Sequence, residues 1–390
     1  MTIVKIAIIG AEVKSIPAVE GGAVETIVDT FLTHNEKTTQ HEITVYAKFN
    51  ERAAKKISMF RYAQGCYVKV RPIGFFSKAA RKLGVLDYRK KYIGRIIKRM
   101  NGKTYDWILI ENRPEFVIPI RKAFPSAKIA VHVHNTYLSV KTRKAKDILD
   151  AADRIITVSD FIADGIKKIN QRDAWKVKTL INRIDINTFK PKTKRHDLLE
   201  KYRIHAETLT VVTHGRIVKD KGILEAIQAI KKAGRQYNHL KLMVIGDLNS
   251  ANLIYKRMIQ KEVKDARIGS IVFTGYVDHD QVPDYLNLAD IIILPSIWDE
   301  PCALTILESL SVGKPVITTN TGGTPEIVSH GSGILVNADT QLVDRLASRI
   351  VYLAKHREVR QIYAEKARNF AVRHLDDKIF FTDFLGRLEG

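Results

Sequence analysis

Two glutamates, Glu300 and Glu308, lie eight residues apart in the segment 295–326. The segment follows an apolar run at 291–295, and Pro301 suits the first position of a helix because proline has no N–H to leave unpaired. A helix from about Pro301 would set the two glutamates roughly 12 Å apart along its axis. The two carboxyls of a glycoside hydrolase lie only ~5–9.5 Å apart. The spacing is instead suited to binding the two ends of one extended ligand, with Glu300 at the sugar hydroxyls and Glu308 at the ribose hydroxyls.

The first turn of such a helix would leave backbone N–H groups without partners inside the helix. These groups would point toward an anion beyond the end of the strand, and a diphosphate fits there. The four expected donors are Cys302, Ala303, Leu304 and Thr305. The alternative is an amphipathic helix with two solvated glutamates, which the spacing alone does not exclude.

The order of features in this segment resembles a known family. Glu300, seven residues, Glu308 and then GKPVITTNTGGTPEIV are similar to the pattern of retaining glycosyltransferases of family 4. The resemblance implies an α/β chain with the GT-B fold, in which two Rossmann-like doubly wound domains face a central cleft. It also implies a nucleoside-diphosphate sugar as the donor substrate, with no cofactor and no metal.

A second motif supplies basic side chains. The stretch TLTVVTHGRIVKDKGIL predicts a buried strand that ends at Gly215 and Arg216, followed by a turn with Lys221 and a helix near Gly222. The carboxyl ends of strands in open α/β sheets are ligand-binding positions. Fixed cations there would lower the barrier to departure of an anionic diphosphate, and the family resemblance implies this role for Arg216 and Lys221. Surface Arg and Lys side chains are the alternative in so basic a chain.

Two further loops have counterparts in the family. Gly21 and Gly22 precede an amphipathic helix, where glycine lets the backbone approach a phosphate closely. No GxGxxG follows the first strand, so the dinucleotide fingerprint of hydride-transfer enzymes is missing. The stretch FTGYVDHD is expected to bring backbone groups of Tyr276 and Val277 to the nucleotide base, and Asp278-His279-Asp280 to form a solvated helix start.

A pair of histidines ends another apolar strand, IAVHVHN. Alternation places His132 and His134 on one face, but the sequence shows no Cys or carboxylate cluster to complete a metal site. The resemblance implies that His134 contacts the donor sugar near the reacting bond, and a hydrogen-bonded structural histidine is the alternative. We find no carboxylate near His134 placed to form a covalent intermediate. We therefore expect attack on the same face of the sugar, assisted by the leaving phosphate.

Alternating strand and helix signals over 390 residues predict two domains of ordinary size. We expect an acceptor-binding domain at 1–186, a linker or hinge at 187–207, a nucleotide-sugar domain at 208–374 and a last helix at 375–390 that returns to the first domain. The two cysteines form no disulfide framework, no signal peptide is evident and no run of 18 apolar residues occurs. These features predict a cytoplasmic protein.

The net charge of +22 is concentrated in residues 51–103, which carry sixteen Lys and Arg against two acidic residues. Aromatic residues interleave with the basic ones, which is typical of a surface that meets anionic lipid headgroups. A solvated basic face whose apolar side packs on the first domain is the alternative, and no nucleic-acid-binding motif is recognised. The residues named for this surface are Phe75, Phe76, Tyr88 and Tyr92 with Lys78, Arg81, Lys82, Lys90 and Lys91.

The residues and the resemblance together predict a retaining, metal-independent hexosyltransferase. Its donor is expected to be a UDP-sugar in preference to a GDP-sugar, and its acceptor a cell-surface glycan or glycolipid at the cytoplasmic face of the membrane. The catalytic residues would be His134, Arg216, Lys221 and Glu300. A non-catalytic surface or coat protein that keeps the fold is the alternative, and nucleic acid is not an expected partner.

Overall fold

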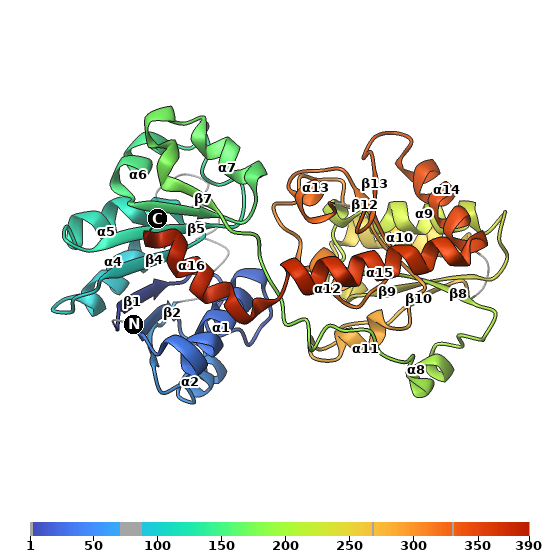
Figure 1. The fold of residues 1–390 in the computed structure, drawn as a ribbon, viewed down its shortest axis with the longest axis horizontal. Helices are drawn as coiled ribbons and strands as arrows, with labels where there is room; N and C mark the ends of the chain where they lie inside the picture. Colours follow the sequence, from blue (N-terminus) through green and yellow to red (C-terminus); the bar gives the residue numbers. More distant parts are fainter. Residues whose placement is uncertain (1–2, 71–87, 267–268, 330, 390) are drawn as a thin grey trace. The chain divides into compact units, whose positions relative to one another are not determined.

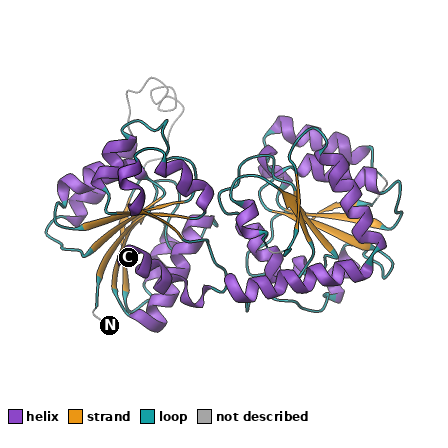
Figure 2. Cartoon of the chain, turned by 45° about the horizontal axis from the view of Figure 1, so that its top comes forward, coloured by secondary structure: helices purple, strands orange, loops and turns teal. Residues whose placement is uncertain are grey.

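The computed structural model describes residues 3–70, 88–266, 269–329 and 331–389. The chain forms two compact units (Figure 1): Met1–Asn182 with Lys378–Gly390, and Arg183–Asp377. Each unit is built on one parallel sheet with helices on both faces (Figure 2). The predicted α/β architecture of two doubly wound domains is confirmed, whereas the finer boundaries at 186, 207 and 374 stay a prediction.

The first unit has a seven-stranded sheet in the order β3-β2-β1-β4-β5-β6-β7. Its strands are near-continuous apolar runs because both faces of the sheet are covered. Within β1, Ala7 and Ile9 pack on one side and Ile6 and Ile8 on the other. The strands are β1 Lys5–Ile9, β2 Glu42–Lys48, β3 Ala63–Val68, β4 Trp107–Glu111, β5 Lys128–Val133, β6 Arg154–Thr157 and β7 Val177–Thr179.

Two groups of helices cover this sheet. The helices α4 Tyr88–Met100, α5 Val117–Ala123, α6 Ala145–Ala151 and α7 Asp160–Lys167 share one apolar cluster with the strands. The helices α1 Ala23–His34, α2 Glu51–Ile57 and α16 Phe380–Glu389 share the opposite cluster. The last helix of the chain thus belongs to the core of the first unit, where three of its phenylalanines surround Phe31 at ring-centroid distances of 4.8–5.2 Å.

The second unit has a six-stranded parallel sheet in the order β10-β9-β8-β11-β12-β13. Its strands are β8 Leu209–His214, β9 Leu240–Ile245, β10 Ile271–Phe273, β11 Ile291–Leu294, β12 Val316–Thr319 and β13 Ile334–Val336. Its helices are α8 His196–Lys201, α9 Ile223–Ala233, α10 Leu253–Lys264, α11 Val282–Leu286, α12 Leu304–Ser311, α13 Thr324–Ile327, α14 Leu342–Lys355 and α15 Arg357–His374. The helices α9, α10 and α14 pack on one face, and α12 packs against α15, β11 and β12.

Each sheet has one point at which the strand order reverses. In the first unit the chain moves outward from β1 to β2 and β3 and then returns to form β4 on the other side of β1. In the second unit the same reversal separates β8 from β11. Ligands of open α/β sheets bind beyond the carboxyl ends of the strands at such switch points. A ligand site is therefore expected at the loops after β1 and β4 in the first unit and after β8 and β11 in the second.

The segment 187–207 is held on the second unit. The backbone N–H of Lys192 donates to the Asn287 side chain at 2.9 Å, and Lys192 and Lys194 form ion pairs with Asp284 and Asp290 at 2.9 and 2.7 Å. The Ser311 hydroxyl donates to the Phe189 carbonyl oxygen at 2.5 Å. The described contacts of this segment therefore fix it to the unit that follows it in sequence.

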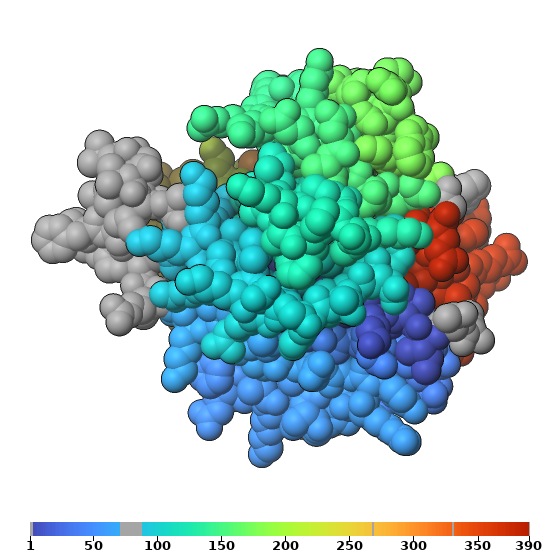
Figure 3. Space-filling view, turned by 90° about the vertical axis from the view of Figure 1, so that its left-hand side faces the viewer, coloured from blue at the N-terminus to red at the C-terminus, as the bar shows by residue number. Residues whose placement is uncertain are grey.

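The basic segment 51–103 is described only in part, since Phe75, Phe76, Lys78, Arg81 and Lys82 lie outside the described residues. Helix α4 buries Tyr92, whose hydroxyl donates to the Gly10 carbonyl oxygen at 3.0 Å. The expectation that Tyr92 enters a membrane interface is therefore wrong, because the apolar side of α4 completes the core of the first unit. The basic residues on the other side of α4, among them Lys91, Lys98 and Arg99, are exposed. Figure 3 shows the surface of the first unit, coloured by position in the sequence.

Candidate functional site

The loops after β8 and β11 bring Lys221 and Glu300 together at the switch point of the second unit. Lys221 Nζ lies 2.6 Å from Glu300 Oε1, and the Ser296 hydroxyl donates to the same oxygen at 2.6 Å. The Glu300 side chain is only 7% exposed. Its other oxygen, Oε2, has no partner among the described residues and is not one of the fully buried atoms. One edge of the carboxylate is thus fixed by the protein, while the other is available to a ligand.

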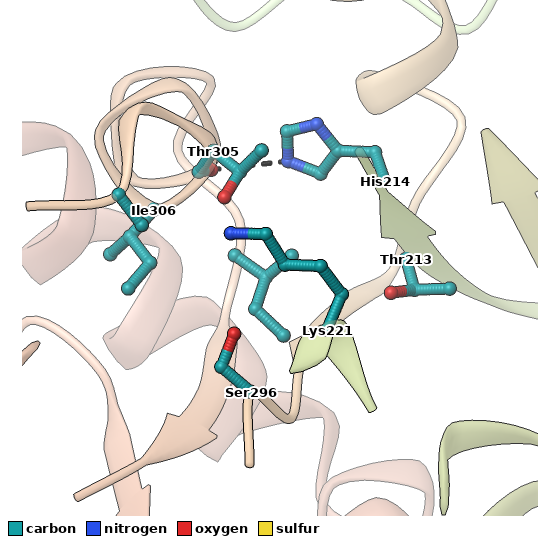
Figure 4. Close-up of a pocket in the computed structure, with 8 residues that line it drawn as sticks. Thr213, His214, Lys221, Ser296, Thr305 and Ile306 are labelled. Atoms are coloured by element: carbon teal, nitrogen blue, oxygen red, sulfur yellow. Dashed lines mark hydrogen bonds between the residues drawn. The ribbon is translucent and has the colours of Figure 1, made fainter. Parts of the chain in front are cut away.

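The position of Lys221 depends on the glycine that follows it. Gly222 has φ +65°, and a Cβ at this position would lie 1.9 Å from the carbonyl oxygen of Pro295. Only glycine lets the start of α9 approach the end of β11 so closely. Figure 4 shows Lys221 reaching into a small pocket between Ser296 and Thr305.

Gly215 and Arg216 directly follow β8, as predicted from the sequence. The Arg216 side chain is exposed and forms no ion pair with any described residue. Thr305, in the first turn of α12, lies near Gly215, since a Cβ on that glycine would be 3.5 Å from Thr305 Cγ2. The strand end that carries Arg216 therefore lies close to the start of α12, and a helix start is suited to an anionic ligand.

The helix predicted from Pro301 begins three residues later, at Leu304, with Ala303 in extended conformation before it. Of the four expected N–H donors, Leu304 and Thr305 lie in the first turn of α12, whereas Cys302 and Ala303 precede it and are buried. Glu300 is therefore not on the helix, and the axial separation of roughly 12 Å from Glu308 does not apply.

The delayed start of α12 has a cause in the loop that follows β12. The N–H of Gly323 donates to the Glu300 carbonyl oxygen at 2.7 Å, and the N–H of Gly322 donates to the Asp299 carboxylate at 3.1 Å. Gly322 has φ +54°, and a Cβ there would lie 2.4 Å from the Glu300 carbonyl oxygen. The two glycines of GGTPE thus hold the backbone of Glu300 outside the helix.

Glu308, in the middle of α12, lies between two histidines. Its Oε2 is 3.6 Å from His214 Nδ1, and its Oε1 is 3.1 Å from His279 Nε2. Burial lowers the pKa of His214, whereas the hydrogen bond to Glu308 raises the pKa of His279. Asp278, His279 and Asp280 are exposed just before α11, which begins at Val282, as expected for a solvated helix start. The contact of His279 with Glu308 was not expected from the sequence. The nearby Tyr276 is 73% exposed and Val277 is half-buried.

In the first unit, Gly21 and Gly22 precede α1 as predicted. Lys14 Nζ donates to the carbonyl oxygens of Glu20 and Gly21, at 3.2 and 2.8 Å, and so fixes this turn. Gly22 is the N-cap of α1, and no side chain caps the helix. The N-cap residue therefore supplies no side-chain acceptor to the first turn of α1.

His134 follows β5 in a cluster that the sequence did not reveal. Its Nε2 lies 3.0 Å from Glu111 Oε2, and His132 Nδ1 lies 3.3 Å from the same oxygen. Burial by itself raises the pKa of Glu111, but His132 and His134 together lower it to about 2. Burial, followed by the charge of His132, lowers the pKa of His134 to about 4. The expectation that no carboxylate completes a possible metal-ligand cluster with the two histidines is wrong, because neighbouring strands bring Glu111 and His132 into register.

The first switch point also carries a buried ion pair. Glu12, beyond the end of β1, accepts from Arg113 Nε at 2.7 Å and Nη2 at 3.2 Å. Arg89 donates to Glu12 at 3.0 Å and to Glu115 at 2.7 Å. Although burial opposes it, the bonds to Arg113 lower the pKa of Glu12. These residues were missed, and the ionisable stretch ENR at the end of an apolar strand was the signal that could have found them.

Two doubly wound α/β units in one chain are the architecture of the GT-B fold. The structure of Anabaena HepE in complex with UDP and glucose covers 99% of this chain and 99% of its own, with a TM-score of 0.76 at 18% identity. Residues 194–370 match the family described as glycosyl transferases group 1. The match covers most of the second unit.

Two curated relatives differ in their described roles. The spore coat protein SA of Bacillus subtilis is 24% identical over an alignment of 387 residues that covers 94% of each chain. The lipopolysaccharide 1,2-N-acetylglucosaminetransferase of Salmonella typhimurium is 28% identical over 291 residues, covering 74% of this chain and 73% of the relative. The relatives of this chain therefore include both a named transferase and a protein named for its place in a coat.

Proposed function

We propose that this protein transfers a hexosyl unit, with retention of configuration, from a nucleoside-diphosphate sugar to a cell-surface glycan or glycolipid. The Lys221–Glu300 pair at the β8/β11 switch point carries the proposal, because it joins a fixed cation to a carboxylate with one free edge. A diphosphate and a sugar hydroxyl are the groups that these two side chains suit. The binding of UDP by Anabaena HepE supports a UDP-sugar in preference to a GDP-sugar.

Each proposed residue has a distinct task. Arg216 and Lys221 stabilise the departing diphosphate, and Glu300 orients the sugar through its hydroxyls. His134 contacts the sugar, and Glu308 binds the ribose. Glu111 is the carboxylate nearest to His134, but its side chain is fully buried and cannot attack an anomeric carbon. Same-face attack assisted by the leaving phosphate remains the proposed route.

A donor panel with product analysis tests the function. UDP-, GDP- and ADP-sugars are screened by thermal shift, since a ligand that binds only the folded protein raises its Tm. The donors that bind are then incubated with glycan and glycolipid acceptors, and NMR assigns the new anomeric bond. We expect the UDP-sugar to give the largest shift and an α-linked donor to give an α-linked product. A β-linked product would contradict retention, and a preference for GDP would contradict the proposed base.

Activity is expected to survive excess EDTA. Arg216, Lys221 and backbone N–H groups supply the positive charge that Mg²⁺ commonly supplies to diphosphates elsewhere. Initial rates with and without the chelator measure the effect, and a metal-dependent transferase assayed in the same buffer is the control. Complete loss of activity, restored by Mn²⁺ or Mg²⁺, would contradict the prediction and return the exposed Asp278 and Asp280 as candidate ligands.

A non-catalytic coat protein is the second candidate, because the spore coat protein SA matches this chain over 94% of both lengths. The site argues against it, since a scaffold has no need of a buried Lys221–Glu300 pair and of an exposed Arg216 that pairs with no described carboxylate. Binding of a donor without hydrolysis or transfer to any acceptor in the panel would favour this candidate.

Peripheral attachment to the cytoplasmic face of the membrane is proposed from the outer face of α4. Lys91, Lys98 and Arg99 are exposed on this helix, while its other side is buried. None of the described helices combines the length and apolar character needed to cross a lipid bilayer. Attachment would therefore rest on attraction between these cations and anionic headgroups, worth about 1 kcal/mol each.

Replacing Lys91, Lys98 and Arg99 by Glu is expected to weaken binding to anionic vesicles by at least ~100-fold. The expected binding also weakens as salt rises, because such attraction is screened over roughly 8 Å at physiological ionic strength. Vesicle flotation measures both effects, with neutral vesicles and an exposed charge reversal at Lys355, in the second unit, as controls. Equal flotation with anionic and neutral vesicles would show that the basic face does not serve this purpose.

A further inference from the structure

The hydrogen bond between Glu111 and His134 determines which nitrogen of the histidine carries the proton. A carboxylate only accepts hydrogen bonds, so the contact of 3.0 Å requires a hydrogen on His134 Nε2. The lowered pKa of His134 keeps the ring neutral near pH 7. The other nitrogen, Nδ1, must then hold a lone pair and act as an acceptor.

His134 Nδ1 is placed to use that lone pair. It has no partner among the described residues, and it is not one of the side-chain atoms sealed away from solvent. The imidazole therefore has one nitrogen turned inward to Glu111 and one that a ligand can reach. At neutral pH Nδ1 can accept a hydrogen bond from a hydroxyl group, but it has no hydrogen to donate to an acceptor.

We propose that Glu111 is a positioning residue that holds His134 in the Nε2–H tautomer, so that Nδ1 accepts a hydrogen bond from a sugar hydroxyl. The inference rests on the proposed function, since it names the group on the sugar that His134 contacts. The proposal gives a role to Glu111, which is fully buried next to the side chain of His134.

The loop after β4 reinforces this arrangement through its backbone. Asn112 adopts a left-handed conformation with φ +56°. Its side-chain oxygen accepts from the His134 N–H at 3.2 Å, and its own N–H donates to the His132 carbonyl oxygen at 2.8 Å. Consecutive residues, Glu111 and Asn112, therefore fix both the ring and the main chain of His134.

The ring of His132 closes the inner side of the cluster. It packs between Phe31 and Phe384, with ring centroids 6.1 and 5.1 Å away, and lies 4.0 Å from the ring of His134. These contacts prevent Glu111 and His134 from moving inward. The tautomer is thus held by a packed environment as well as by a single hydrogen bond.

A metal ion is the competing explanation, because Glu111, His132 and His134 could each offer a ligand atom within 4.8 Å of the others. Metal-bound histidines almost always donate their second N–H to an acceptor. Glu111 Oε1 and both ring nitrogens of His132 are buried without a hydrogen-bond partner, and the rings of Phe31 and Phe384 pack against the His132 imidazole. His132 therefore lacks the outer hydrogen bond of a typical metal ligand, which favours the direct Glu111–His134 hydrogen bond over a shared ion.

Imidazole nitrogen shifts from NMR of histidine-labelled protein test the proposal. The chain has twelve histidines, so a His134→Asn variant assigns the signal. We expect the Nε2–H tautomer in the wild-type protein, its retention in Glu111→Gln, whose amide oxygen can still accept, and its loss in Glu111→Ala. Glu115→Gln, which removes a carboxylate that binds only Arg89, should leave the signal unchanged.

Kinetics then connect the tautomer to turnover. Glu111→Ala should lower kcat/KM by on the order of 10- to 100-fold, as expected for a lost oriented hydrogen bond, and Glu111→Gln should recover most of it. An Nδ1–H tautomer in the wild-type protein, an unchanged tautomer in Glu111→Ala, or a stoichiometric metal ion in the purified protein would overturn the proposal. The NMR experiment needs no turnover of a donor. It can therefore contradict the tautomer proposal independently of the proposed function.

Discussion

Arg216→Ala is expected to lower kcat/KM by on the order of 10²–10³ without a measurable change in thermal stability. The catalytic loss follows from removal of one preorganised positive group at the leaving diphosphate. The unchanged stability follows from the structure, since the Arg216 side chain is exposed and pairs with no described carboxylate. Steady-state rates and Tm measure the two effects.

Lys221→Ala is expected to show the same catalytic loss together with a lower Tm. Its removal leaves Glu300 buried without its cation, and breaking a buried pair typically costs about 3–5 kcal/mol. The nearby exposed Lys219 provides a matched control, since Lys219→Ala should change neither quantity. Turnover like that of the wild-type protein in both Arg216→Ala and Lys221→Ala would refute the assignment of the diphosphate site.

Phe384→Ala is expected to destabilise the first unit by about 3–5 kcal/mol, the usual cost of truncating a buried phenylalanine. Phe384 is fully buried in α16, and its ring lies 4.8 Å from Phe31 and 5.1 Å from His132. Two units need not unfold together, so hydrogen exchange resolved by peptide is the suitable measurement. Faster exchange should appear in β1, β5 and α1.

Phe370→Ala is the control for this experiment. Phe370 is half-buried on α15 in the second unit, so its truncation should cost less and leave exchange in the first unit unchanged. If Phe384→Ala accelerated exchange only within α16, that helix would be a peripheral addition and not part of the core.

The positions of Gly215, Arg216 and Lys221 were predictable because they depend on order along the chain. An apolar strand followed by glycine and basic residues fixes which side chains stand at the carboxyl edge of a parallel sheet. The start of α12 was not predictable in this way. Pro301 favours a helix locally, but hydrogen bonds from Gly322 and Gly323, more than twenty residues later, hold Glu300 and its neighbours in an extended loop.

Glu111 and Tyr92 show a second limit of the sequence. The histidine pair was recognised from alternation within one strand. Its carboxylate partner, Glu111, comes from the adjacent strand, and the register between two strands could not be predicted from either segment alone. Tyr92 shares its helix with exposed basic residues, and its burial depends on which side of α4 meets the sheet. Both outcomes depend on tertiary contacts between different segments of the chain, which only the folded structure shows.

The place of α16 in the first core has a consequence for biosynthesis. The ribosome completes residues 1–182 first, but Phe380, Phe381 and Phe384 emerge only after the whole of Arg183–Asp377 has been translated. At typical rates of 5–20 residues per second this interval lasts roughly 10–40 s. During that time the apolar surface around Phe31 lacks the cover that α16 supplies in the folded chain, and a chain that ends before α16 leaves this core incomplete although the second unit has all of its residues.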